Sequence, residues 1–251
     1  QGDTMAYVAN GADGRFKNST DWVGAGNMLL ERGYSFRSAT AESVGPYPVL
    51  SDGGCVHFSE IMCLLIQENL RRGSDLLAAA AQAYQDWPAE IVGMALSADC
   101  ADSFVAMRIN QPLVIGRGGG AVCAATTTLA FPPGMDWRMP MPPNTAARVG
   151  RDGLRVLPFT RYVPASDMPP VDAVHEAVVT ALQREPQTIG GLCGMTTPLW
   201  PRELLAQPAM LVYQTVAALV EAGRAELATE TVPGMFGEGT APRTTVRWVG
   251  E

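Results

Sequence analysis

Apolar residues recur at helical spacing in three stretches of the first third of the chain. The pattern predicts one helix that ends at Gly33, a second from Ser59 to about Arg72, and a third over residues 75–87. A single glycine–serine turn separates the second helix from the third. We therefore expect these two helices to form a helical hairpin or corner.

Short apolar runs bounded by turn residues follow these helices. Four of them are predicted to be strands, namely residues 103–109, 113–116, 122–131 and 154–163. Residues 90–98 are also apolar, and we interpret them as a helix. Residues 132–153 are rich in proline, glycine and methionine and are predicted to be a long loop. Strands that follow helices without strict alternation favour an α+β fold.

The last third of the chain has a different order of elements. Its pattern predicts a helix over residues 171–184, a short second helix that opens at Thr188 and a third over residues 208–222. Two strands, residues 225–232 and 244–249, then flank a tip rich in glycine and proline. We expect three units: an N-terminal mixed helix and antiparallel-sheet domain, a linker, and a C-terminal module, over residues 5–163, 164–170 and 171–251. The first boundary is Met5 because residues 1–4 look like the remnant of a cleaved tag ahead of a start methionine.

Three helices followed by a two-stranded wing is the order of a winged helix. The stretch Val216-Ala-Ala-Leu-Val-Glu-Ala-Gly-Arg-Ala-Glu-Leu227 resembles the end of the third helix and the first wing strand of winged-helix domains. The chain departs from the family pattern at residues 196–207, an insertion where DNA-binding members usually have a tight turn. The resemblance covers the last third of the chain only.

The resemblance implies that the third helix would present exposed side chains to the major groove of DNA. Gln214 is the base-reading residue type on that helix, which carries no cation. Arg243 and Arg247 share one face of the second wing strand because side chains alternate along a strand, and Arg224 lies near the start of the first. These four residues are the candidate DNA contacts.

The charge balance disfavours DNA as a partner. The chain has 18 basic and 25 acidic residues and a formal net charge of -7 at pH 7. Affinity for phosphate comes largely from counterion release by lysine and arginine, so an acidic chain is a poor general binder of nucleic acid. The sequence has neither an apolar run long enough to span a bilayer nor a leader peptide, and we expect a cytoplasmic protein without a membrane partner.

Residues 52–60 hold the densest group of chemically reactive side chains. Cys55, His57 and Glu60 are the catalytic candidates, because a histidine near a helix start can activate a cysteine. Cys55, His57 and Cys63 are the metal-ligand candidates, although paired zinc-ligand spacing is absent from the sequence. A structural role for all of them is the competing interpretation, and the sequence identifies no cofactor.

The leading hypothesis is a non-catalytic cytoplasmic accessory or regulatory protein. Its winged-helix-like module would serve protein–protein interaction or self-association into a homo-oligomer. One alternative is a DNA-binding transcriptional regulator whose N-terminal domain senses a small molecule. The other is an enzyme that uses Cys55 and His57 on a small molecule.

Overall fold

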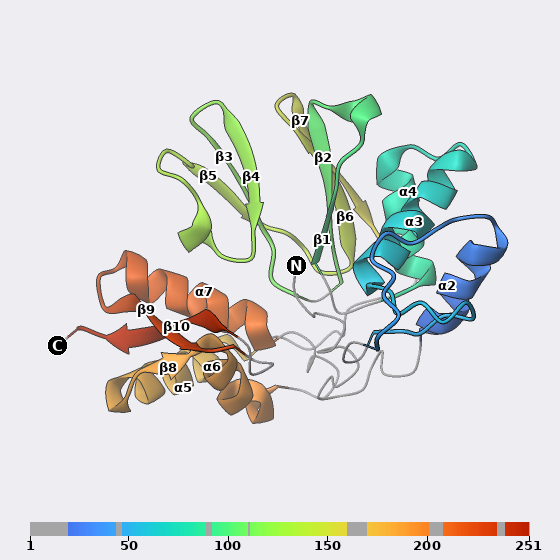
Figure 1. Ribbon diagram of the computed structural model, residues 1–251. Helices are drawn as coiled ribbons and strands as arrows, with labels where there is room; N and C mark the ends of the chain where they lie inside the picture. Colours follow the sequence, from blue (N-terminus) through green and yellow to red (C-terminus); the bar gives the residue numbers. More distant parts are fainter. Residues whose placement is uncertain are drawn as a thin grey trace.

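The computed structural model describes residues 20–43, 47–88, 92–109, 111–159, 170–200, 208–234 and 239–250. The described chain is α+β and has two parts, an N-terminal part of helices and antiparallel sheets and a C-terminal module (Figure 1). Residues 164–169 of the expected linker and residues 235–238 of the expected wing tip lie outside the described residues.

Helices α2, α3 and α4 form at the three predicted places and cover residues Trp22–Glu31, Phe58–Arg71 and Leu76–Asp86. The carboxylates of Asp21 and Asp75 accept hydrogen bonds from backbone N–H groups in the first turns of α2 and α4. Helix α3 begins one residue before the predicted start at Ser59, and His57 takes the N-cap position. The helices bury their apolar faces in one core.

A four-stranded antiparallel sheet forms the central layer of the N-terminal part. Its order is β1-β2-β6-β7, with bounds Val92–Ala95, Ser103–Arg108, Thr145–Gly150 and Gly153–Pro158. Helix α4 packs on one face, α3 packs against α4, and α2 packs against α3 (Figure 1). The other face packs against a second sheet of order β4-β3-β5, with bounds Ala121–Ala125, Val114–Gly118 and Trp137–Pro140. Two short 3-10 turns complete this part, η1 over Ala98–Cys100 and η2 over Thr128–Ala130.

Two predictions for the N-terminal part are wrong, and a third holds only in part, because the strand expected over residues 122–131 ends at Ala125 and residues 128–130 form η2. Residues 90–98 are not a helix, because residues 92–95 form strand β1 at the edge of the central sheet. Residues 132–153 are not one long loop, because they contain β5 and β6. Strand β6 has no hydrophobic alternation to reveal it, since it is covered by helices on one face and by the second sheet on the other.

The C-terminal module has a core of its own, built from its helices and its sheet. Its helices are α5, α6 and α7, over Val171–Arg184, Ile189–Thr196 and Pro208–Glu221, with a short turn η3 over Thr197–Leu199. Its sheet has the order β8-β10-β9, with bounds Gln187–Thr188, Thr240–Trp248 and Ala225–Pro233. These positions confirm the predicted helices and strands. Within the described ranges, no helix is long and apolar enough to cross a bilayer.

Candidate functional site

The segment that carries Cys55 and His57 is extended and held by bridges to two other segments. Cys55 pairs with Thr40 and with Val49, its side chain is 3% exposed, and its Sγ lies 3.9 Å from the carbonyl oxygen of Tyr47. His57 is exposed, and its ring stacks on the ring of Tyr47 at a centroid distance of 4.5 Å. The thiol of Cys55 is therefore buried while the imidazole of His57 lies at the surface.

The third catalytic candidate, Glu60, is engaged by the loop before it. Its carboxylate accepts hydrogen bonds from the backbone N–H groups of Arg37 and Ser38, both at 2.8 Å, and from the hydroxyl of Ser38. The same hydroxyl accepts a hydrogen bond from the backbone N–H of His57. Desolvation by burial acts to raise the pKa of Glu60, but the bonds from Ser38 and Arg37 outweigh it and the pKa is lowered. Glu60 thus stabilises the start of α3.

The metal-ligand candidates are not gathered into a site. Cys63 is exposed on α3, whereas Cys55 is buried in the preceding segment. In the part of the chain that the structure describes, no three His, Cys, Asp or Glu residues are close enough to hold a metal ion. The arrangement of Cys55, His57 and Cys63 therefore supplies no metal-binding geometry.

The candidate DNA contacts on the wing are all engaged with neighbouring side chains. Arg243 lies opposite Glu230 and bonds it at 2.7 Å, and Arg247 lies opposite Glu226 and bonds it at 3.2 Å. The guanidinium of Arg224 lies 4.7 Å from the ring centroid of Trp248.

The two strand arginines do share an exposed face, as alternation predicted, while Val246 between them is buried. The positive charge of this face is balanced by the glutamates of β9. A phosphate would have to displace a carboxylate from each arginine.

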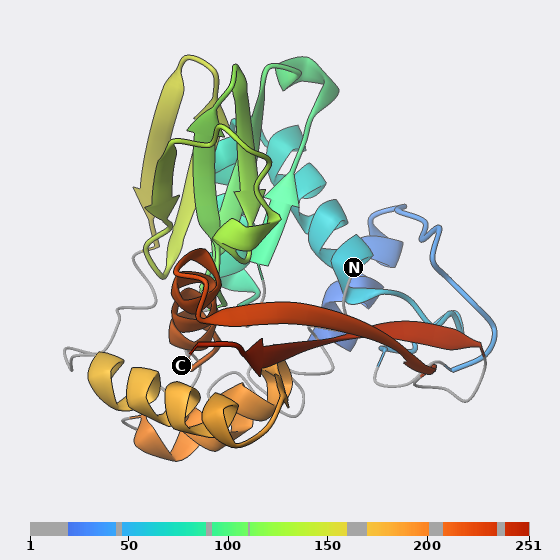
Figure 2. The ribbon, with the colours of Figure 1, turned by 90° about the vertical axis from the view of Figure 1, so that its left-hand side faces the viewer.

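Helix α7, which carries Gln214, packs against the N-terminal part (Figure 2). Its last residue, Glu221, bonds Arg138 of β5 at 2.6 Å and accepts a hydrogen bond from Thr128 of η2 at 3.2 Å. At its other end the Sδ of Met210 lies 3.5 Å from both Nη atoms of Arg108. Gln214 is exposed but lines a small crevice together with residues 126–128.

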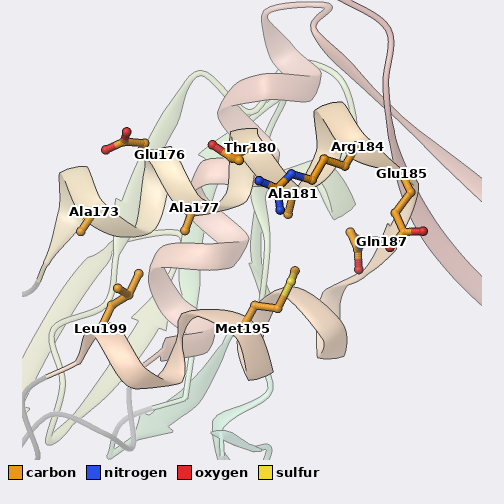
Figure 3. A pocket seen from close by; sticks show the side chains of 10 residues that line it. All are labelled: Ala173, Glu176, Ala177, Thr180, Ala181, Arg184, Glu185, Gln187, Met195 and Leu199. Carbon is orange, nitrogen blue, oxygen red and sulfur yellow. Dashed lines mark hydrogen bonds between the residues drawn. The ribbon is translucent and has the colours of Figure 1, made fainter.

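An open groove of about 480 Å³ lies on the C-terminal module between α5 and α6 (Figure 3). Small side chains four residues apart, those of Ala173, Ala177 and Ala181, form its α5 side. Met195 and Leu199 extend toward α5 from the opposite side and are 47% and 39% exposed. Polar and charged residues line the remainder, namely Glu176, Thr180, Arg184, Glu185 and Gln187.

The sequence analysis did not identify the α5–α6 groove. The four-residue spacing of Ala173, Ala177 and Ala181 was a signal of a groove wall in the sequence, because residues four apart lie on one face of a helix. The exposure of Met195 and Leu199 was not predictable, because their helical positions alone do not tell a core face from an uncovered one. The chain matches no protein-family model and no curated protein.

Proposed function

We propose that this chain is a non-catalytic accessory or regulatory protein of the cytoplasm that binds a protein partner through its winged-helix-like C-terminal module. The observation that carries the proposal is the α5–α6 groove, which is open and partly apolar on the module's surface. Exposed apolar side chains gathered in one concave surface are typical of interaction sites. Helix α7, which a DNA-binding winged helix would insert into the major groove, is instead engaged by the N-terminal part.

The order of elements supports the winged-helix assignment. Helix α5, strand β8, helices α6 and α7, and the β9–β10 hairpin follow one another, and β8 pairs with β10. Ten residues of the expected resemblance, Val216 to Ala225, run from the end of α7 to the start of β9. The module thus combines the family's element order with a helix surface that is free of cations.

The occupant that best fits the α5–α6 groove is an amphipathic helix of the partner. Alanines at successive helical turns allow a second backbone to approach closely, and Met195 and Leu199 provide flexible apolar anchors. Charges of both signs at the rim, on Glu176, Arg184 and Glu185, suit a helix whose polar edges carry both signs.

The experiment compares two variants with matched chemistry. Met195→Glu places a carboxylate in the groove, and Leu227→Glu places one at a similarly exposed apolar position on β9, outside it. We expect one partner to co-purify with the wild-type chain and with Leu227→Glu, and to be depleted about tenfold with Met195→Glu. Quantitative mass spectrometry of the purified complexes measures this.

Native mass spectrometry of the same samples reports self-association. A homodimer that Met195→Glu dissociates and Leu227→Glu leaves intact would make the second copy the groove's occupant. If every co-purifying protein is recovered equally with the wild type, Met195→Glu and Leu227→Glu, the proposal is contradicted.

The DNA-binding alternative makes an opposite prediction. It requires fluorescent duplex DNA to bind with an affinity that falls steeply with salt and that the triple variant Arg224→Ala, Arg243→Ala, Arg247→Ala abolishes. The leading proposal expects this triple variant to retain its partner, because the three arginines lie on the wing and not in the α5–α6 groove.

A further inference from the structure

Strand β1 is the outermost strand on one side of the central sheet. In the described part of the chain it pairs only with β2, so alternate residues of β1 direct their backbone N–H and C=O groups away from the sheet. Natural edge strands are usually protected by charge or proline. Residues 92–98, Val-Gly-Met-Ala-Leu-Ser-Ala, have neither. Met94 and Leu96 are 62% and 77% exposed on this edge.

A groove of about 910 Å³ lies between this edge and helix α3. The wall on the helix side is one continuous face of α3, formed by Ser59, Met62, Cys63, Ile66, Gln67 and Leu70. The opposite wall is β1 and the residues that follow it, up to Asp99. The groove is separate from the α5–α6 groove, which lies on the C-terminal module.

Strand β1 has small residues on its helix-facing side. Gly93 and Ala95 point toward the core beneath the helices, and a side chain at Gly93 would collide with the hydroxyl of Tyr84. Tyr84 and Met107 form the inner end of the groove.

The lining is electrically close to neutral. Arg71 and Asp99 are the full charges among its described residues, one of each sign. The guanidinium of Arg71 is already placed over the ring of Tyr34, 4.4 Å from its centroid. One charge of each sign gives no cluster of like charge for a nucleotide, a phosphate group or a strongly charged peptide, so an uncharged occupant matches this lining better.

We propose that the β1–α3 groove binds an extended, uncharged segment of a partner polypeptide. The segment adds as a strand to the free edge of β1 and places every second side chain against the apolar face of α3. A polypeptide is favoured over a small apolar molecule because its backbone can pair with the outward N–H and C=O groups of β1, which a small apolar molecule would cover and leave without partners. The site lies on the N-terminal part and adds a second binding function to the one proposed above.

The first test is a selection from a display library of random short peptides. The library is panned on the wild-type chain and depleted on Leu96→Lys, which places a charge on the strand edge without removing a buried side chain. We expect enriched peptides to be uncharged, with apolar residues at alternate positions. Enrichment of charged or helix-patterned peptides, or no enrichment over the Leu96→Lys background, would overturn the proposal.

The second test measures the best synthetic peptide by fluorescence anisotropy. Leu96→Lys should weaken binding about tenfold or more. The control Val156→Lys carries the same change on β7, at the opposite edge of the same sheet, and should bind as the wild type does. Methylation of alternate backbone nitrogens in the peptide should abolish binding, because it removes strand pairing and keeps the side chains. Equal binding of the methylated peptide would overturn strand addition.

Cys63 provides a direct report of where the peptide lies. It is exposed and lines the β1–α3 groove, whereas Cys123 lies on β4 outside it. The peptide should slow alkylation of Cys63 by iodoacetamide and leave the rate at Cys123 unchanged. Protection of Cys63 by the neutral dye Nile red and not by the peptide would reassign the groove to small apolar molecules. Loss of a homodimer in Leu96→Lys, without peptide binding by the wild type, would reassign it to a second copy of the chain.

Discussion

Glu60 is of a residue type that often serves in catalysis, but its hydrogen bonds here hold two segments of the fold together. Its carboxylate joins the loop at residues 37–38 to the first turn of α3, where the negative charge also suits the helix dipole. The sequence identified Glu60 as a reactive type near a helix start. It could not identify the partner, because Ser38 is 22 positions away in sequence and is brought close only by the fold.

Replacement of this carboxylate should have a pH-dependent effect on stability. At neutral pH we expect Glu60→Gln to lower the free energy of unfolding by about 1–2 kcal/mol, since an amide loses the charge-assisted bonds. The pKa of Glu60 is lowered in the folded chain. Its stabilisation is therefore complete above the unfolded-state pKa and is lost as the pH falls through the folded-state pKa.

Urea unfolding at neutral and at acid pH measures this effect. The difference between wild type and Glu60→Gln should shrink at acid pH, while Glu31→Gln, an exposed change on α2, should have little effect at either. A difference that is equal at both pH values would contradict the assignment.

The exposure of the five cysteines predicts their order of alkylation. Cys63 and Cys100 are exposed, whereas Cys55 is buried and lies beside the backbone of Tyr47. We expect iodoacetamide to label Cys63 and Cys100 well before Cys55 in the folded chain, and all three at similar rates in urea. Time-resolved peptide mass spectrometry gives the rates. Preferential labelling of Cys55 would instead support the cysteine-dependent enzyme.

At the scale of elements, the helices and strands that the sequence predicted correctly are those with a clear hydrophobic periodicity. Helices α3 and α5 have clear amphipathic patterns and formed where they were expected. Strand β1 is a short apolar run, which periodicity alone does not distinguish from a helix segment. The pairing of Arg243 with Glu230 was also beyond prediction, because it depends on the register between β9 and β10.

The contact between β1 and α4 is tight enough to test by one methyl group. A Cβ on Gly93 would overlap the hydroxyl oxygen of the buried Tyr84 and lie 2.9 Å from Cε of Met107. We expect Gly93→Ala to lower the free energy of unfolding by about 1–3 kcal/mol through overpacking.

Adding Tyr84→Phe removes the oxygen and should recover part of that loss. Denaturant unfolding of the two single variants and the double variant completes a double-mutant cycle. Strictly additive effects would mean that Gly93 and Tyr84 do not press on each other.

At the scale of the whole molecule, the two parts have separate cores and meet along α7. Besides the bonds of Glu221, Leu129 of η2 packs against the core of the C-terminal module. The Arg138–Glu221 pair is about half exposed on both sides, so its contribution to stability is modest.

Removing this pair should loosen the junction without unfolding either core. We expect Glu221→Gln to cost about 0.2–1 kcal/mol and to speed amide hydrogen exchange in η2 and β5. The buried centres of α3 and α5 should exchange as in the wild type. Mass-resolved exchange of both chains provides the measurement, and faster exchange throughout the module would show that Glu221 supports its core instead.

The buried side chain of Arg108 reaches from the central sheet of the N-terminal part to helix α7 of the C-terminal module. Arg108 lies opposite Val92 of β1 in the sheet, and its guanidinium contacts Met210 of α7, the helix that packs behind α5 and α6. If a strand added to β1 shifted Arg108, and if the contact with Met210 passed this shift on to α7, the two proposed grooves would be coupled. Thermodynamic linkage then makes the coupling reciprocal: each ligand changes the affinity for the other by the same factor.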